Sequence, residues 1–143
     1  MFLSRLFGTK SEREMKKLAP TIKKINQYYE TLSSKSDEDL VEKTQKLKEF
    51  VIKTREEKES SLSLSMDKKE RASEILKAEQ GALDLIMVEA FAIVKDTCRR
   101  MFGSSWKASG QEIKWEMIPY DVQIIGGIIL HRGNVAEMKT GEG

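Results

Sequence analysis

The chain ends in Val135-Ala136-Glu137-Met138-Lys139-Thr140-Gly141-Glu142-Gly143, and this stretch decides the fold. A phosphate-binding loop has the pattern G-x-x-x-x-G-K-[ST]. Its glycines let backbone N–H groups close on phosphate oxygens, and its lysine and hydroxyl then reach the phosphates and Mg²⁺. The glycine turn of that pattern is present here, and the lysine would be the next residue. We therefore expect the chain to be the N-terminal piece of a nucleotide-hydrolysing protein.

The residues just before the glycine turn predict the order of elements at this end of the chain. Asp121 is expected to cap a helix that runs to Leu130, and residues 133–134 are expected to form a turn after it. Val135–Met138 is expected to be a short strand that leads into the loop, which is the context that a phosphate-loop match requires. Helix, turn, strand and loop in this order open an α/β nucleotide-binding domain.

Upstream of this region, the sequence predicts three amphipathic helices. Residues 11–32 repeat apolar side chains every three or four positions, and Pro20 is expected to kink or split this helix. Ser36 is expected to cap a second helix, because three acidic residues follow it where the helix dipole is positive. A serine-rich linker over residues 60–65 separates this helix from a third, expected over about residues 67–100.

Each predicted helix has an expected buried stripe. The stripes are Met15, Leu18, Ile22, Ile25, Tyr29 and Leu32 in the first helix; Leu40, Thr44, Leu47 and Val51 in the second; and Leu83, Ile86, Ala90, Val94 and Thr97, with Leu85, Val88, Phe91 and Ala92 beside them, in the third. The width of the last stripe implies burial on more than one side. Residues 103–118 are expected to be irregular after a stop at Gly103, with a short strand permitted over residues 112–117.

Composition narrows the class of protein. Of 143 residues, 39% are hydrophobic and 34% are charged, and the formal net charge is +2. That charge is too small to indicate a nucleic-acid partner. Cys98, the single cysteine, excludes an internal disulfide and is expected to be a packed or half-exposed thiol rather than a nucleophile. The single histidine, His131, is expected in a turn, and no Cys/His cluster has metal-ligand spacing.

Positive charge is concentrated at the start of the chain, where residues 1–30 hold seven Lys/Arg against three Asp/Glu. Apolar side chains would share one side of a short helix there, with basic residues nearby: Phe2, Leu3, Leu6 and Phe7 with Arg5, Lys10 and Arg13. This combination predicts a helix that binds an anionic membrane surface. A solvated or frayed end, or an anchor packed on another helix, is the alternative.

Three residues shortly before the glycine turn form a candidate base-binding site. Gln123 carries a donor and an acceptor side by side, which match the N7 acceptor and N6 amino group of adenine. Tyr120 and Met117 offer flat or soft apolar surface for the base. The alternative is that all three only pack at the start of a helix, but a glycine turn 18 residues downstream favours the nucleotide site.

Two stretches near the end of the chain carry a family signature: Asp121-Val122-Gln123-Ile124-Ile125-Gly126-Gly127-Ile128-Ile129-Leu130 and Ala136-Glu137-Met138-Lys139-Thr140-Gly141-Glu142-Gly143. With them the chain resembles the SecA family, the motor ATPase of bacterial preprotein export, which shows a DVQ helix with two glycines and then A-E-M-x-T-G-E-G-K-T. Other segments match the family in order: Leu6-Phe7-Gly8, Ser36-Asp37-Glu38-Asp39-Leu40 and Glu89-Ala90-Phe91-Ala92-Ile93-Val94. The resemblance covers nearly the whole chain.

The resemblance implies a role for each residue of the candidate site. It places Gln123 on adenine, Tyr120 and Met117 along the base pocket, and the phosphate loop on Thr140, Gly141, Glu142 and Gly143. The lysine and threonine that hold the terminal phosphates and Mg²⁺ would follow the last glycine, and the catalytic carboxylate and second motor lobe would lie further on. The fragment alone is therefore expected not to hydrolyse ATP.

The expected fold is mostly α, with N-terminal helices that lead into the first strand of a RecA-like α/β P-loop motor domain. The expected divisions are a basic and apolar arm over residues 1–13, a helical part of the first nucleotide-binding domain over residues 14–118, and the adenine-reading motif, first strand and P-loop over residues 119–143. The resemblance implies ATP and Mg²⁺ as cofactors. As partners it implies the SecYEG channel, preproteins, anionic phospholipids and a second copy of the protein, without nucleic acid, at the cytoplasmic face of the inner or plasma membrane.

Two other function classes fit part of the pattern. A DEAD-box-like RNA helicase would share Gln123 and the loop, but the helix over residues 121–130 and the long helical N-terminus favour the translocation motor. A non-enzymatic helical interaction module would fit the helices but not the match of the tail to a catalytic loop. The residues that follow Gly143 would decide between them.

Overall fold

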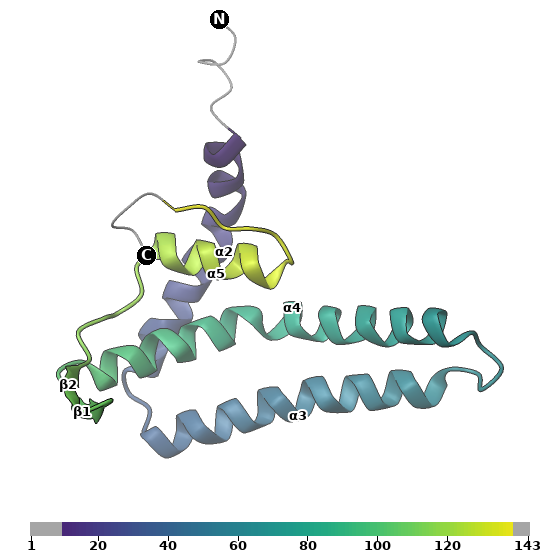
Figure 1. The fold of residues 1–143 in the computed structure, drawn as a ribbon, viewed down its shortest axis with the longest axis horizontal. Helices are drawn as coiled ribbons and strands as arrows, with labels where there is room; N and C mark the ends of the chain where they lie inside the picture. Colours follow the sequence, from purple (N-terminus) through teal and green to yellow (C-terminus); the bar gives the residue numbers. More distant parts are fainter. Residues whose placement is uncertain (1–9, 139–143) are drawn as a thin grey trace, which may run out of the picture.

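The computed structural model describes residues 10–138, with side chains from Arg13 onward. Four helices and one β-hairpin make up this part of the chain (Figure 1). In chain order they are α2 (Lys10–Leu32), α3 (Asp37–Ser61), α4 (Lys68–Met101), β1 (Ser105–Ala108), β2 (Gln111–Lys114) and α5 (Asp121–His131). The predicted mostly helical fold is confirmed, and so are the helices predicted over residues 11–32, from Ser36, over residues 67–100 and over residues 121–130. The short membrane-binding helix predicted around residues 2–7 lies outside the described residues.

The long helix α4 is the centre of the arrangement, because it packs against both α2 and α3 while α2 also packs against α5. Figure 1 shows α3 and α4 as an antiparallel pair, with α2 crossing the C-terminal half of α4 and α5 lying across α2 on the side away from α3. The N-terminal half of α4 and the C-terminal half of α3 extend beyond this crossing. The end of α5 reaches the N-terminal half of α4, where His131 Nε2 lies 3.2 Å from Gln80 Nε2 and 2.7 Å from Asp84 Oδ1.

Two helix starts are capped by side chains: the cap at Ser36 is the predicted one, and Asp67 caps the helix expected to begin there. The backbone N–H of Asp39 donates to Ser36 Oγ at 3.1 Å, and the N–H of Ser36 donates to Asp39 Oδ2 at 3.0 Å, which completes a reciprocal capping box. Asp67 accepts from the N–H groups of Lys69 and Glu70 at 2.8 and 3.3 Å. The serine-rich break therefore ends one helix and starts the next, with residues 62–67 as the connecting loop.

Of the kink or split predicted at Pro20, the split is wrong, because α2 continues through this residue as one helix. Proline removes one backbone donor and leaves the carbonyl four residues earlier without its partner. That carbonyl belongs to Lys16, and both Lys16 and Pro20 are exposed. Water can therefore satisfy the carbonyl, and the helix tolerates the proline.

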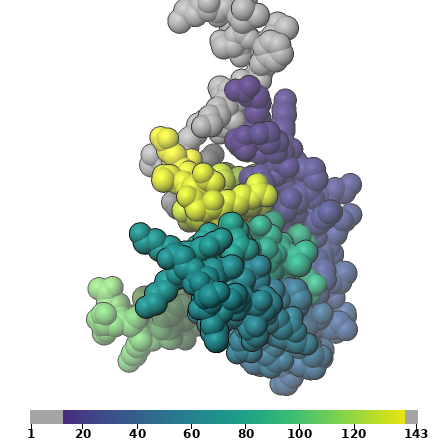
Figure 2. Space-filling view, turned by 90° about the vertical axis from the view of Figure 1, so that its right-hand side faces the viewer, coloured from purple at the N-terminus to yellow at the C-terminus, as the bar shows by residue number. Residues whose placement is uncertain are grey.

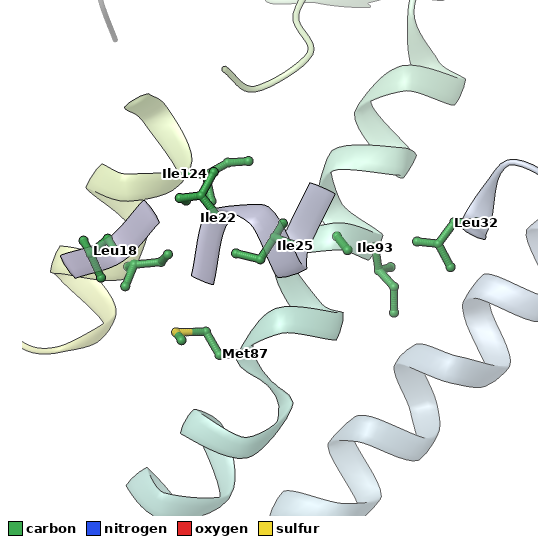
Figure 3. Close-up of a cluster of buried hydrophobic side chains, with 9 residues drawn as sticks. Leu18, Ile22, Ile25, Leu32, Met87, Ile93 and Ile124 are labelled. Atoms are coloured by element: carbon green, nitrogen blue, oxygen red, sulfur yellow. The ribbon is translucent and has the colours of Figure 1, made fainter. Parts of the chain in front are cut away.

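The core forms where α2, α4 and α5 meet (Figure 3). From α2 it takes Leu18, Ile22, Ile25 and Leu32, as predicted, whereas Met15 is 44% exposed. The other members are Met87, Ala92 and Ile93 of α4 and Ile124 and Ile128 of α5. In α3 only Leu40 of the predicted stripe is buried, because this helix packs mainly against one neighbour, α4.

The predicted buried stripe of α4 is confirmed in part: Ala92 is buried, and Val88 and Phe91 pack against the core. Val94 is 56% exposed and Leu85 is 76% exposed, while Met87 and Ile93 are buried. Apolar residues surround this part of α4, so their spacing alone leaves the rotation of the helix undetermined. Packing against α2 and α3 decides which residues are covered, and the predicted burial on more than one side is confirmed.

The segment predicted to be irregular contains a two-stranded antiparallel hairpin, in which Trp106 pairs with Ile113 and Ala108 with Gln111. Its turn residues Ser109 and Gly110 have φ values of 51° and 80°, the left-handed pair that a two-residue hairpin turn of type I′ requires. The hairpin projects from the body of the molecule (Figure 2). The predicted strand at residues 112–117 was one arm of this hairpin, displaced by a few residues.

The predicted strand over Val135–Met138 is wrong for the described chain, since residues 134–138 have no regular secondary structure. A strand exists through its neighbours, and the one sheet in residues 10–138 is the distant hairpin. Two smaller expectations also change. Tyr120, not Asp121, is the cap residue of α5, and His131 is the last helical residue, where its Nε2 lies 2.7 Å from Asp84 Oδ1.

Candidate functional site

Gln123 lies in the first turn of α5 with its amide held by the backbone. The N–H of Tyr120 donates to Gln123 Oε1 at 2.9 Å, and the carbonyl of Tyr120 accepts from the N–H groups of Gln123 and Ile124 at 3.0 and 3.1 Å. An amide oxygen has two lone pairs, so one remains. Within residues 10–138 no group binds that lone pair or Gln123 Nε2. The side chain is thus oriented and still presents a donor beside an acceptor.

The two predicted apolar walls of the base site are open to solvent. Met117 is 44% exposed and Tyr120 is 74% exposed. Both lie on the short segment that leads from the hairpin into α5, within six residues of Gln123. The structure therefore brings the three residues onto one segment but does not close a pocket over them.

The predicted phosphate loop, Thr140, Gly141, Glu142 and Gly143, lies outside the described residues. The segment that leads to it is described and returns to α5. A methyl group added at Gly126 would collide with Met138 Cε and lie 3.9 Å from Ala136 Cβ. The approach to the glycine turn therefore crosses the same helix that begins beside Gln123, and Gly126 leaves room for it.

The second glycine of α5 faces the other way, toward α4. A Cβ at Gly127 would lie 2.7 Å from Phe91 Cε1, closer than real Cβ contacts allow. The missing side chain lets α5 settle against the Phe91 ring. The adjacent glycines of the family signature thus serve two separate contacts, one with α4 and one with the approach to the phosphate loop.

A polar cluster that sequence reasoning missed ties the start of α5 to two other helices. Asn26 Nδ2 of α2 donates to Asp121 Oδ1 at 3.0 Å. Lys95 Nζ of α4 donates to Asn26 Oδ1 at 2.7 Å and lies 3.5 Å from Asp121 Oδ1. Asp121 directly precedes Val122 and Gln123 in the chain, which was the one local hint that this carboxylate belongs to the site.

Other features of the described chain indicate no second chemical centre. A groove of about 550 Å³ between α2 and α5 includes Met15, Ile22 and Asp121 in its lining but none of the three predicted base-site residues. Burial raises the pKa of the Cys98 thiol, which keeps it protonated and a poor nucleophile. Residues 10–138 contain no His, Cys, Asp or Glu group arranged to hold a metal ion, and none of their helices is long and apolar enough to cross a bilayer.

Comparisons with known proteins agree with the signature in the sequence. A family model described as the SecA DEAD-like domain matches residues 3–143. Three similar curated proteins are each named protein translocase subunit SecA. The one from Chloroherpeton thalassium is 39% identical over 160 residues, covering 99% of this chain and 15% of that protein. The one from Prosthecochloris aestuarii is 39% identical over 158 residues, covering 98% and 15%, and the one from Salinibacter ruber is 35% identical over 179 residues, covering 99% and 15%.

This chain therefore spans about 15% of the length of the relatives that it matches. No solved structure matches it. The family match nevertheless extends over nearly every residue, including both glycines of α5 and the segment that crosses them. On this evidence the chain belongs to the SecA DEAD-like domain family.

Proposed function

We propose that this chain is the N-terminal part of an ATP-driven motor that pushes preproteins through the SecYEG channel, and that its own task is to read the adenine base of ATP. Membership of the SecA DEAD-like domain family supports the first half. The observation that carries the second half is the amide of Gln123, which a backbone bond orients at the start of α5 while leaving a donor and an acceptor available.

Adenine presents an N6 donor and an N7 acceptor along one edge, and a glutamine amide is the complementary pair. Gln123 Nε2 would donate to N7, and the remaining lone pair of Oε1 would accept from the N6 amino group. Tyr120 and Met117 would cover the faces of the base, which is consistent with their present exposure of 74% and 44%. Guanine presents two acceptors on that edge and leaves the acceptor of Gln123 without a donor.

The phosphates would bind the backbone of Thr140, Gly141, Glu142 and Gly143. The lysine and threonine that the signature places next would hold the terminal phosphates and Mg²⁺. Mg²⁺ neutralises charge on the phosphates during transfer, and the protein contributes position and further positive charge. Without that lysine and the catalytic carboxylate, the present 143 residues would not hydrolyse ATP on their own.

The motor would work in the cytoplasm and at the cytoplasmic face of the inner or plasma membrane. The basic and apolar arm over residues 1–13 would bind anionic phospholipids there, and two copies of the protein would pair. Residues 1–9 of the arm lie outside the described structure, so sequence alone supports this contact.

The test uses the full-length protein. Its ATP hydrolysis is measured alone, with an unfolded preprotein, with SecYEG vesicles, with both, and with RNA. A translocation motor is stimulated most when preprotein and channel are present together, and the 143-residue chain alone shows no turnover. Stimulation by RNA, with no response to preprotein or channel, would instead identify a helicase. No ATP hydrolysis under any condition would reject both motor classes.

A further inference from the structure

We propose that Asn26 and Lys95 are positioning residues of the adenine site. Through Asp121 they fix the start of α5 so that the amide of Gln123 meets the base edge. They would thereby set the preference for adenine without contributing to phosphate binding. This inference rests on the proposed function, because it concerns how the same site selects its base.

The geometry joins three helices at one point. Asn26 comes from α2, Lys95 from α4 and Asp121 from the first turn of α5. Lys95 Nζ donates to Asn26 Oδ1 at 2.7 Å, so the other end of that amide, Nδ2, must face Asp121, to which it donates at 3.0 Å. Lys95 therefore determines which way the Asn26 amide points, and Asn26 determines where Asp121 is held.

The ammonium of Lys95 is well placed to act as a rigid support. Its side chain is only 13% exposed, and its Nζ lies 5.2 Å from the centroid of the Tyr29 ring. A cation so far removed from water needs partners nearby, and here they are Asn26, Asp121 and the face of Tyr29. A surface lysine would sample many positions, whereas these contacts confine this one.

Helix stability alone does not explain the contact between Asn26 and Asp121. A carboxylate in the first turn of a helix is already favoured by the helix dipole, and it gains this benefit while facing water. The Asp121 side chain is 55% exposed, so water could satisfy it without any bond to α2. A directional bond to Asn26 adds what water cannot, namely a fixed position relative to α2 and α4.

The position of Asp121 in turn determines the position of Gln123. Asp121 and Gln123 lie two residues apart in the same turn, and the Tyr120 N–H bonds Gln123 Oε1 at 2.9 Å. Further along α5, Ile124 and Ile128 are buried and Gly127 lies against Phe91, so the body of the helix is packed. The first turn has two outward-facing residues, Tyr120 and Asp121, and Asp121 is the one tied to the other helices. Releasing it would let the amide of Gln123 shift relative to a bound base.

The experiment compares ATP with ITP, whose base differs from adenine by carrying an oxygen at position 6 in place of the amino group. Affinities are measured on the full-length protein, together with tripolyphosphate, which carries no base. A bidentate amide–base pair is worth roughly 5- to 150-fold in discrimination. We expect Asn26→Ala to reduce the ATP-over-ITP preference by about threefold to tenfold and to leave tripolyphosphate binding unchanged.

Matched variants separate positioning from general damage. Gln27→Ala, at the next and exposed position of α2, should leave the preference intact. Asp121→Asn keeps an oxygen acceptor for Asn26 Nδ2 and should stay close to the parent protein, whereas Asp121→Ala should behave like Asn26→Ala. If Asn26→Ala fails to fold, the two Asp121 variants still test the positioning role, because Asp121 lies on the exposed first turn of α5.

The outcomes are distinct for the two levels of the proposal. If Gln123→Ala abolishes the preference while Asn26→Ala and Asp121→Ala leave it unchanged, the positioning role is wrong and adenine reading stands. If Gln123→Ala itself has no effect on the preference, the proposed function fails at its base-reading step. If Asn26→Ala has no further effect in a Gln123→Ala background, the two residues act on the same contact and the inference is supported.

Discussion

Arg100 Nε donates to Asp96 Oδ2 at 2.7 Å, and the carboxylate that receives this bond is fully buried. Arg99 binds the other oxygen, with its Nη2 atom 2.7 Å from Asp96 Oδ1. The remaining nitrogens of Arg100 donate to the carbonyls of Leu32 and Lys35 at 3.0 and 2.7 Å and to Asp37 Oδ1 at 2.6 Å. One guanidinium thus joins carbonyls at and just after the end of α2 to Asp37 at the start of α3 and Asp96 near the end of α4.

Loss of Asp96 should therefore destabilise the three-helix junction, because this buried carboxylate holds both Arg99 and Arg100. Removing one partner of a buried charge pair typically destabilises a protein by about 3–5 kcal/mol. Because both arginines are partly exposed, we expect Asp96→Ala to lower the free energy of unfolding by about 3 kcal/mol. Urea unfolding followed by circular dichroism measures the change. Glu42→Ala is the control, because its exposed pair with Lys46 one turn away in α3 is worth about 0.3–0.5 kcal/mol. Equal effects of the two substitutions would refute the special role of Asp96.

Alanine in place of Gly81 of α4 and alanine in place of Gly127 of α5 should change the stability of the chain in opposite directions. Gly127→Ala places a methyl group 2.7 Å from Phe91 Cε1 and should destabilise the chain by about 1–3 kcal/mol, as overpacking does. Gly81→Ala meets nothing within 4 Å in the exposed middle of α4 and should stabilise by about 0.5–1 kcal/mol through helix propensity.

Thermal unfolding of both glycine variants gives the comparison, and Phe91→Leu in the Gly127→Ala background should recover part of the loss by giving the methyl group space. A neutral or stabilising Gly127→Ala would show that α5 does not lie against Phe91 as described.

Stability should fall as the solution becomes alkaline. Burial raises the pKa of Tyr28, Tyr29 and Cys98, and the hydrogen bond to the Tyr28 hydroxyl raises the pKa of Lys43. All four groups hold their protons more tightly in the folded chain than in the unfolded chain. Their contribution is therefore complete below the ordinary pKa values and is lost as pH rises.

The decline should begin near pH 9.0, the ordinary pKa of a cysteine, and continue through 10.0, that of a tyrosine. Melting temperatures measured from pH 7 upward provide the curve. Cys98→Ala should flatten its first part and Tyr28→Phe its later part, whatever each does to stability at neutral pH. A flat or rising curve above pH 9 in the parent chain would contradict the assignment.

The hairpin should unfold independently of the helices when its turn is disturbed. Gly110 has a φ of 80°, so Gly110→Val forces a β-branched residue into a left-handed conformation and should cost about 1–2 kcal/mol. Both tryptophans of the chain lie in or beside the hairpin, with ring centroids 6.1 Å apart, so selectively excited tryptophan fluorescence reports on this region. We expect an altered tryptophan spectrum with unchanged helical circular dichroism. A loss of helical signal would mean that the hairpin supports the core.

Features that depend only on neighbouring residues could be predicted from the sequence. Ser36 was expected to cap a helix, and such a cap can be predicted because a side-chain oxygen and the N–H group that it binds lie within three residues of each other. The cap at Asp67 is equally local. The same holds for the α2 stripe, where Leu18, Ile22 and Ile25 follow one helical period. The Ser109-Gly110 turn was also local, and its dipeptide between two alternating runs could have identified the hairpin.

What could not be predicted depends on partners far away in the chain. The exposed Val94 and buried Ile93 differ by one position, and only the placement of α2 and α3 decides between them. Asn26 and Asp121 are separated by 95 residues, so their bond leaves no mark in any local pattern. The strand expected at Val135–Met138 needs neighbours to pair with, and none lies among residues 10–138. For the base site, residue types could be read from the sequence, but the backbone bond that orients Gln123 could not.

Nucleotide titration of the full-length protein tests most directly whether Gln123 reads adenine. Affinities for ATP and GTP are measured for the parent protein and for Gln123→Ala, and the result is expressed as their ratio. Because one bidentate pair contributes roughly 1–3 kcal/mol of discrimination, the preference for ATP should fall by about tenfold or somewhat more. Phosphate binding should persist, since it uses the backbone of the glycine turn. An unchanged ratio would mean that Gln123 only caps α5 through its bond to Tyr120, and adenine reading by this residue would be contradicted.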